Sequence, residues 1–166
     1  MVNTTPSRLL FVCMGNICRS PSAEGVFQKL IDSEQLSERF FLDSAGTHAY
    51  HVGESPDSRS QRVALARGID IAHQRARQVR TQDLEQFDLL LAMDRQNYQG
   101  LQKIASSDSQ RQRIRLMMDF APALPEDEVP DPYYGEGDQG FERVLNLLEH
   151  AAEGLLAHLL DENAGR

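Results

Sequence analysis

Hydrophobic positions along this 166-residue chain follow two alternating patterns. Short continuous apolar runs, bounded by polar or glycine-containing segments, are typical of strands buried on both faces. They predict strands at Arg8–Val12, Phe40–Leu42, Phe87–Met93 and Arg113–Met118. Longer segments repeat apolar residues with the 3.6-residue period of an amphipathic helix. They predict helices at Ser20–Ile31, Ser58–Arg67, Thr81–Glu85, Asp94–Ile104 and Phe141–Leu160.

Alternation of strands with helices predicts an α/β fold around a mostly parallel sheet, whose ligands bind beyond the carboxyl ends of the strands. Cys13 falls at such a strand end. Ser20 is expected to cap the first helix, with Pro21 at its first position. The run Asp43–Gly46 is expected to form the turn that leaves the second strand. The segment 122–140, rich in proline and glycine, is expected to be a long functional loop.

Length and composition fit one globular domain over residues 1–166, with an ordered core at about 8–160. A hydrophobic content of 40% and a charged content of 25% exclude disordered and fibrous classes. No apolar run approaches the roughly 18 residues of a membrane span, and the polar start does not resemble a secretory signal. Two closely spaced cysteines, Cys13 and Cys18, fit a reducing cytoplasm, where a thiol is more often chemical than structural.

The formal net charge of −8 is unevenly distributed. The window from Leu116 to Glu142 holds eight acids and no Lys or Arg, whereas Arg59 to Arg80 holds six arginines and one acid. Nucleic-acid binding needs a dominant basic surface, so an acidic chain makes that class of function unfavourable. Most of the clustered arginines are expected to form a solvated face, and the alternative is that they steer an anionic substrate.

The junction between the first strand and the first helix reads Cys13-Met-Gly-Asn-Ile-Cys-Arg19-Ser20. Backbone N–H groups in such a turn can form an anion-binding nest, and the helix N-terminus adds a positive dipole end. Gly15 and Asn16 both tolerate the positive φ that such a turn needs. Arg19 offers a planar fork for two phosphate oxygens. Cysteines in such surroundings have pKa values of about 3.5–7.5 instead of about 8.5, which predicts a nucleophilic Cys13 thiolate assisted by the Ser20 hydroxyl.

Expelling an alkoxide or phenoxide from phosphorus needs a proton donor, and Asp131 between two prolines is the candidate. The surrounding acids, Glu126, Asp127 and Glu128 among them, are expected to raise its pKa. Taken alone, Asp131 would instead be a carboxylate that stabilises a turn. The expectation of general-acid chemistry therefore depends on the phosphate loop at Cys13.

The junction resembles the signature of low-molecular-weight protein tyrosine phosphatases. Further runs similar to the same family occur in order along the chain: Asp43–Gly46, Gly53–Asp57, Gly68–His73, Ala76–Gln78, Phe87-Asp88, Met93-Asp94 and Val129–Tyr134. The resemblance covers nearly the whole chain. It implies a four-stranded parallel sheet flanked by helices on both faces, and a metal-free hydrolase that acts on phosphotyrosine in proteins without a cofactor.

The resemblance also implies roles for individual residues. Cys13 corresponds to the nucleophile, Arg19 to the phosphate-clamping arginine and Asp131 to the general acid. The phosphate-binding loop then comprises Met14, Gly15, Asn16, Ile17, Cys18 and Ser20, supported by Ser44 and His73. Tyr50, Tyr133 and Tyr134 are expected to line the substrate cleft. In this family the tyrosine pair can itself be phosphorylated, so a cognate tyrosine kinase is a candidate partner, although no residue identifies one.

Rival functions on the same scaffold stay open at this point. Arsenate reductases resemble this chain but use further cysteines towards the C-terminal half, and none follows Cys18. Phosphoarginine phosphatases resemble it with Thr at the position of Ile17. A non-catalytic phosphate-binding adaptor would not require Cys13, Arg19 and Asp131 together. The protein is expected to be a monomer or weak homodimer with no nucleic-acid or membrane partner, and Cys18 is expected to protect oxidised Cys13 as a reversible disulfide.

Overall fold

Four parallel strands form the centre of the molecule in the computed structural model, which describes residues 5–135 and 137–164. They are β1 (Ser7–Cys13), β2 (Phe40–Gly46), β3 (Leu89–Ala92) and β4 (Ile114–Leu116), in the spatial order β2-β1-β3-β4. The predicted α/β class and parallel sheet are confirmed. Because β1 and β3 are neighbours, the order reverses beside β1, the place where such sheets bind ligands.

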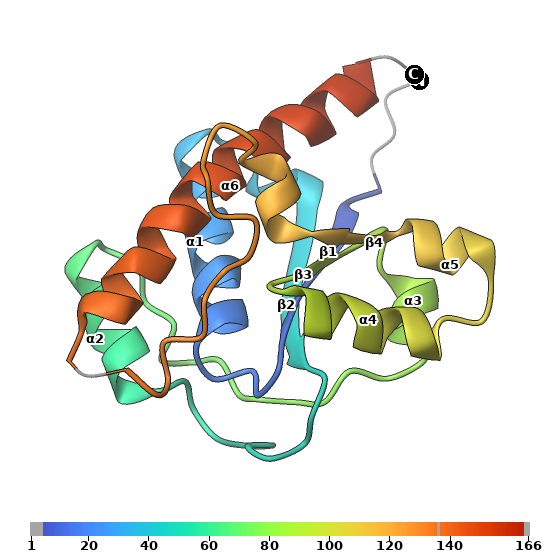
Figure 1. The fold of residues 1–166 in the computed structure, drawn as a ribbon. Coiled ribbons are helices and arrows are strands. Elements are labelled where there is room, and N and C mark those ends of the chain that lie inside the picture. The colour runs from blue at the N-terminus through green and yellow to red at the C-terminus, as the bar shows by residue number, and fades with distance from the viewer. Residues whose placement is uncertain (1–4, 136, 165–166) are drawn as a thin grey trace.

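Among the described residues, six helices surround the sheet: α1 (Arg19–Ser33), α2 (Ser58–Ala66), α3 (Asp83–Gln86), α4 (Arg95–Ile104), α5 (Asp108–Gln112) and α6 (Gln139–Ala164). Two short 3₁₀ helices, η1 (Ser37–Arg39) and η2 (Met117–Phe120), precede β2 and follow β4. Figure 1 shows α1, α2 and α6 on one side of the sheet and α3, α4 and α5 on the other. The pattern of hydrophobic residues did not predict α5, η1 or η2, which are shorter than two turns.

Alternate residues of β1 enter two separate cores. Leu9 and Phe11 pack with α1 and α6, whereas Leu10 and Val12 pack with α3 and α4 on the opposite face, and all four are fully buried. This two-residue alternation is the geometry of a strand covered on both faces. It explains why β1 reads as a continuous apolar run and why it lies rigidly at the centre of the sheet.

Three local expectations were wrong. Asp43–Gly46 continues β2 rather than leaving it, because these residues pair with Leu10–Cys13 of β1. Helix α1 begins at Arg19, and its N-cap is Cys18 without a side-chain cap bond. Ser20 does not cap the helix because its hydroxyl is directed to other partners in the phosphate loop. The helix predicted at Thr81–Glu85 begins instead at Asp83, after Gln82.

The end of β2 lies very close to the chain that follows β1. A Cβ on Gly46 would come within 2.6 Å of the Met14 carbonyl oxygen, so only glycine fits there. The next residues bond directly to this chain: Thr47 N–H donates to Cys13 O at 2.9 Å and His48 N–H donates to Met14 O at 3.0 Å. The segment after β2 therefore forms one wall beside the strand-to-helix turn.

Candidate active site

The turn from β1 to α1 places the catalytic candidate at the bottom of a cup. Asn16 adopts φ of 58°, the left-handed conformation that the sequence assigned jointly to Gly15 and Asn16. Gly15 is needed for space instead, because a Cβ there would lie 3.0 Å from the His51 ring. Cys13 is 3% exposed, and its Sγ accepts a hydrogen bond from Asn16 N at 3.3 Å.

The Ser20 hydroxyl lies 3.1 Å from Cys13 Sγ, as the sequence predicted for an assisting serine. This sulfur therefore has a backbone donor, a hydroxyl and the N-terminus of α1 around it. Each of these groups stabilises negative charge on sulfur more than a neutral thiol. The arrangement suits a nucleophile that is also a leaving group.

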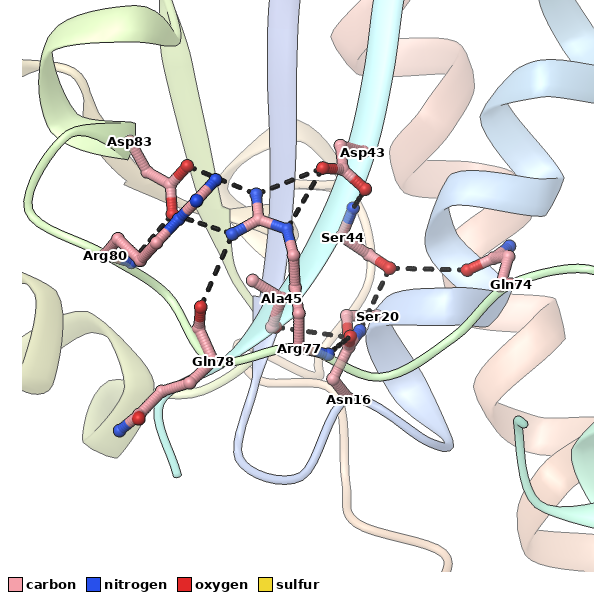
Figure 2. Close-up of polar contacts among 10 residues, drawn as sticks. All are labelled: Asn16, Ser20, Asp43, Ser44, Ala45, Gln74, Arg77, Gln78, Arg80 and Asp83. Atoms are coloured by element: carbon pink, nitrogen blue, oxygen red, sulfur yellow. Dashed lines mark hydrogen bonds and ion pairs between the residues drawn. The ribbon is translucent and has the colours of Figure 1, made fainter. Parts of the chain in front are cut away.

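Behind the cup, the Asn16 side chain joins three segments of the chain (Figure 2). Its Nδ2 donates to Ser20 Oγ at 2.7 Å and to Ser44 Oγ at 2.9 Å, and its Oδ1 accepts from Arg77 N at 3.0 Å. Asn16, Ser20 and Ser44 are all buried. The structure thus brings Asn16, Ser20 and Ser44 together as the sequence predicted.

His73 was predicted to support this loop, and the structure contradicts that prediction. His73 is exposed in a turn, whereas the next residue, Gln74, points inward. Ser44 Oγ donates to Gln74 Oε1 at 3.3 Å, and Gln74 Nε2 donates to Pro21 O at 3.0 Å. Gln74 therefore occupies the position expected for His73. The chain becomes extended only after the turn, so the residue that faces the phosphate loop is one position later in the sequence.

Arg19 is held by a carboxylate that the site prediction did not include. Its Nη1 donates to Asp94 Oδ2 at 2.7 Å and to Val129 O at 3.1 Å, so the edge formed by Nε and Nη2 faces the cup. Burial alone would lower the pKa of Arg19, but negative charge on Cys13 and the bond to Asp94 outweigh it and raise the pKa. Asp94 follows a buried strand directly, and that position was the available signal for its role.

Asp131 lies across the cup from Cys13, in the loop 121–138 between η2 and α6. Its Oδ1 accepts a hydrogen bond from Tyr133 N at 3.0 Å, and its Oδ2 lies 3.8 Å from Arg19 Nη2. The side chain is 30% exposed. One carboxylate oxygen is therefore fixed by the backbone, while the other lies on the side of Arg19.

The acidic and basic segments of the sequence are in part partners of each other. Arg62 pairs with Asp138 at 2.7 Å, and Arg67 pairs with Glu142 at 2.5 Å. The predicted solvated face of arginines is thus in part a clamp on the loop that carries Asp131. Further acids of this segment pair with arginines outside the basic one: Asp127 and Glu128 with Arg95, and Glu126 with Arg143. The unpaired like charges expected around Asp131 are therefore largely compensated in the fold.

A pocket of about 240 Å³ opens above Cys13. Its lining includes most of the predicted site: Cys13, Met14, Gly15, Ile17, Cys18, Arg19, Tyr50, Asp131, Tyr133 and Tyr134. The rings of Tyr133 and Tyr134 meet edge to face with centroids 5.0 Å apart, and Tyr50 stacks on His48 at 5.2 Å. Such walls suit a flat aromatic ring.

His51 also lines this pocket, although nothing in the sequence separates it from other surface histidines. Its Nδ1 lies 2.6 Å from Glu54 Oε2, and its ring packs at 6.3 Å from that of Tyr133. The carboxylate fixes the ring orientation and leaves Nε2 as the free edge. No residue spacing in the sequence could have shown that this loop folds over the cup.

Cys18 has an environment different from that of Cys13. Burial raises its pKa to about 12, the negative charges of Asp57 and Cys13 add to this, and the nearby Ser60 hydroxyl only partly opposes it. Both cysteines are free. Cys18 is therefore a protonated, weakly nucleophilic thiol at neutral pH.

Glu24 is a second buried titratable group near the loop. Burial raises its pKa to about 7, and the neighbouring Asp43 charge adds to this, while Ser44 and Arg77 favour the ionised form. The described residues contain no group of three or more His, Cys, Asp or Glu side chains placed to hold a metal ion. Within the same residues, no helix is long and apolar enough to cross a membrane.

Comparisons with known proteins agree with this geometry. The family described as low molecular weight phosphotyrosine protein phosphatase matches residues 8–164. A Streptomyces coelicolor protein named low molecular weight protein-tyrosine-phosphatase is 38% identical over 96% of this chain and 97% of its own length. The human low molecular weight phosphotyrosine protein phosphatase is 39% identical over 87% of this chain and 90% of its own.

Solved structures show the same fold. The crystal structure of a protein tyrosine phosphatase from Entamoeba histolytica, with Hepes in its active site, superposes with a TM-score of 0.90 at 44% identity, covering 94% of this chain and 98% of that one. A Drosophila arginine phosphatase structure has a TM-score of 0.85 at 30% identity, covering 91% and 96%. The scaffold is therefore shared by proteins named as tyrosine phosphatase and as arginine phosphatase.

Proposed function

The chain belongs to the low molecular weight phosphotyrosine protein phosphatase family and is a hydrolase of phosphotyrosine, and we propose that Cys13, Arg19 and Asp131 carry its reaction. The observation that carries the assignment of roles is their convergence on one pocket from three separate segments. A sulfur with donors at 3.3 and 3.1 Å, a buried guanidinium and a half-exposed carboxylate surround the same small volume.

In the first step, loop N–H groups and the free edge of Arg19 bind the phosphate oxygens. Cys13 sulfur attacks phosphorus in line, a sulfur–phosphorus bond forms, and the bond from phosphorus to the tyrosine oxygen breaks. Asp131 donates its proton to that oxygen, so tyrosine leaves as a neutral phenol. The phosphoryl group stays on Cys13.

In the second step, Asp131, now a carboxylate, accepts a proton from water, and the water oxygen attacks phosphorus. The sulfur–phosphorus bond breaks, inorganic phosphate is released, and the electron pair returns to Cys13. The Ser20 hydroxyl at 3.1 Å stabilises the departing sulfur. Both residues thus serve both halves of the reaction: Asp131 changes from proton donor to proton acceptor, and Cys13 changes from nucleophile to leaving group.

A phosphotyrosine ring fits the walls of this pocket better than a phosphoguanidinium does. Ile17 lies in the lining as an apolar side chain, and Tyr50, Tyr133 and Tyr134 supply aromatic surface. Arsenate reduction would need a relay of further thiols, and Cys13 and Cys18 are the chain's only cysteines. A non-catalytic adaptor that only binds phosphate would not need the Asp131 carboxylate beside Arg19 of the phosphate loop.

The decisive test is to follow phosphate release from a phosphotyrosine peptide, with phosphoserine and phosphoarginine peptides as comparison substrates. We expect preference for phosphotyrosine and a phosphoryl adduct on Cys13 that rapid quenching and peptide mass spectrometry detect. Cys13→Ser should form no such adduct, whereas Cys18→Ser, which removes the other thiol, should still form it. An adduct on any other residue, or preference for phosphoarginine, would overturn the assignment.

Three further expectations extend this proposal. Cys18 would trap a sulfenic acid on Cys13 as a disulfide, slowly because its thiol is protonated, so Cys18→Ser should speed irreversible loss of activity in peroxide.

The unpaired cysteines suit a cytoplasmic location. The protein would act on phosphoproteins as a monomer or weak homodimer, which sedimentation at increasing concentration would check.

A further inference from the structure

An extended segment, residues 74–79, runs behind the phosphate loop along the end of β2, and we call it the strap. Two backbone hydrogen bonds join it to the sheet: Gly46 N–H donates to Arg77 O at 2.8 Å, and Val79 N–H donates to Gly46 O at 2.8 Å. The strap is neither helix nor regular strand. Two more backbone bonds hold it, from Ala76 N–H to Glu54 O and from Gly53 N–H to Ala76 O, both at 2.8 Å, and its side chains add further contacts.

The Arg77 side chain holds the strap between two carboxylates (Figure 2). Nε and Nη2 donate to Asp43 Oδ2 at 3.1 and 3.0 Å, while Nη1 and Nη2 donate to Asp83 Oδ2 and Oδ1 at 2.9 and 3.2 Å. The Asp83 side chain is only 1% exposed and that of Asp43 is 39% exposed. A buried carboxylate requires its cation, and a planar fork that bridges two carboxylates fixes position and direction together.

The backbone of the same residue controls the orientation of the Asn16 amide. Because Arg77 N–H can only donate, the atom it meets at 3.0 Å must be the carbonyl oxygen of Asn16. The amide nitrogen then faces Ser20 Oγ at 2.7 Å and must donate to it. With its oxygen occupied as an acceptor, the Ser20 hydroxyl directs its proton to Cys13 Sγ at 3.1 Å, nearer than its alternative acceptor, Ala45 O, at 3.5 Å.

We propose that Arg77 is a positioning residue for the nucleophile, and that its anchored N–H orients the Asn16 amide so that Ser20 donates to the Cys13 sulfur. This proposal rests on the proposed function only in that Cys13 is the nucleophile. Arg77 itself touches neither the pocket lining nor the reacting atoms. If the strap shifts, the Asn16 amide can reverse, and its oxygen would then accept the Ser20 proton in place of the sulfur.

The experiment measures Cys13 alkylation by iodoacetate against pH, in the whole protein and without substrate. Arg77→Ala should move the midpoint of alkylation upward by about one pH unit, the equivalent of one lost hydrogen bond to the sulfur. Arg77→Lys keeps a positive charge between the carboxylates but lacks the planar guanidinium that bridges them, so it should shift the alkylation midpoint less than Arg77→Ala does. Arg80→Ala is the matched control, because it removes a nearby arginine whose own contact with Asp83 is made by its backbone N–H.

A double-variant cycle separates positioning from general loss of structure. In a Ser20→Ala background the proton donor is already gone, so adding Arg77→Ala should produce no further shift. Two outcomes would overturn the proposal. In the first, Arg77→Ala shifts the alkylation midpoint equally in the wild-type and Ser20→Ala backgrounds. In the second, Arg77→Ala and Arg77→Lys have the same midpoint as Arg80→Ala. Should Arg77→Ala not fold, Arg77→Lys alone decides, measured at a temperature at which circular dichroism shows it folded.

Turnover provides a second readout. Arg77→Ala should lower kcat for a phosphotyrosine peptide by about tenfold with KM changed much less, because the departing sulfur in the second step loses its donor. Wild-type protein that fails to hydrolyse the peptide would refute the proposed function, whereas the alkylation comparison would still test the positioning role. The two failures are therefore distinguishable.

Discussion

The phosphate loop lies on the buried side of the pocket, and the loop that carries Asp131 lies on its exposed side. The first is fixed by the central strand β1, by the buried Asn16 amide and by the strap behind it. The second is long and lacks regular structure, and Arg62 and Arg95 hold it through ion pairs near the surface. One reacting partner is thus placed by the core and the other by the surface.

The difference follows from what each group must do. A thiolate needs donors that do not move, because electrostatic stabilisation depends on dipoles fixed before the reaction begins. A general acid must exchange protons with water and change its role between the two steps, so a partly exposed position suits Asp131. The contrast predicts that substitutions on the buried side alter stability together with binding or chemistry, whereas those on the exposed side alter chemistry alone.

Replacement of Asp131 by Asn should give the largest effect. We expect kcat for phenyl phosphate to fall by about 10²–10⁴-fold with KM nearly unchanged, because the leaving oxygen no longer receives a proton. For p-nitrophenyl phosphate, whose leaving group needs little protonation, the fall should be smaller. Steady-state kinetics with both esters checks this, and equal losses for the two would show that Asp131 is not the proton donor.

Replacement of Asp94 by Asn tests the buried side. Arg19 is 4% exposed and Asp94 is its nearest anion at 2.7 Å, so losing the charge should misplace the guanidinium. The inhibition constant of inorganic phosphate should rise by about 10–100-fold. Asp108→Asn is the control, because that carboxylate is 94% exposed in α5. A phosphate affinity that matches the control would mean that Asp94 does not position Arg19.

Burial of Glu24 should make the free energy of unfolding depend on pH. Burial raises its pKa from 4.5 to about 7, so the unfolded chain ionises first as the pH rises. Its favourable contribution is therefore complete below pH 4.5 and is lost as the pH rises through about 7, a change of roughly 1–3 kcal/mol. Glu24→Gln does not titrate, so its stability relative to wild type should increase over this range. Thermal unfolding of both proteins from acid to neutral pH measures the difference, and a constant difference would contradict the prediction.

Arg62→Ala should have the smallest effect, on the exposed side. The Arg62 and Asp138 side chains are 60% and 42% exposed, and such pairs contribute little. We expect kcat to change by less than about threefold, and the change should disappear in high salt. Titration of activity with sodium chloride in both proteins checks this. A large loss that persists in high salt would mean that the exposed loop is held as rigidly as the buried one.

Local patterns in the sequence were sufficient for β1, α1 and α6, because these elements either pack on the core along their whole length or present a long apolar stripe to it. Short elements were missed because a single turn carries too few apolar residues to show a period. The same limit led to the selection of His73 in place of Gln74, since nothing local marks where a turn ends and an extended strap begins. The sequence placed Asp94 after a buried strand but did not indicate that it belongs to the active site.

The sequence by itself determined the chemistry of the strand-to-helix turn, because a phosphate-binding cup is made of consecutive residues whose spacing is covalent. The tertiary structure alone decided which distant groups complete it: the Asp94 carboxylate, the Gln74 amide, the His51 ring and the fork of Arg77. Their distances from the turn depend on how strands and loops pack, and packing is a property of the whole chain. For the same reason, charge that is segregated along the sequence becomes paired in space.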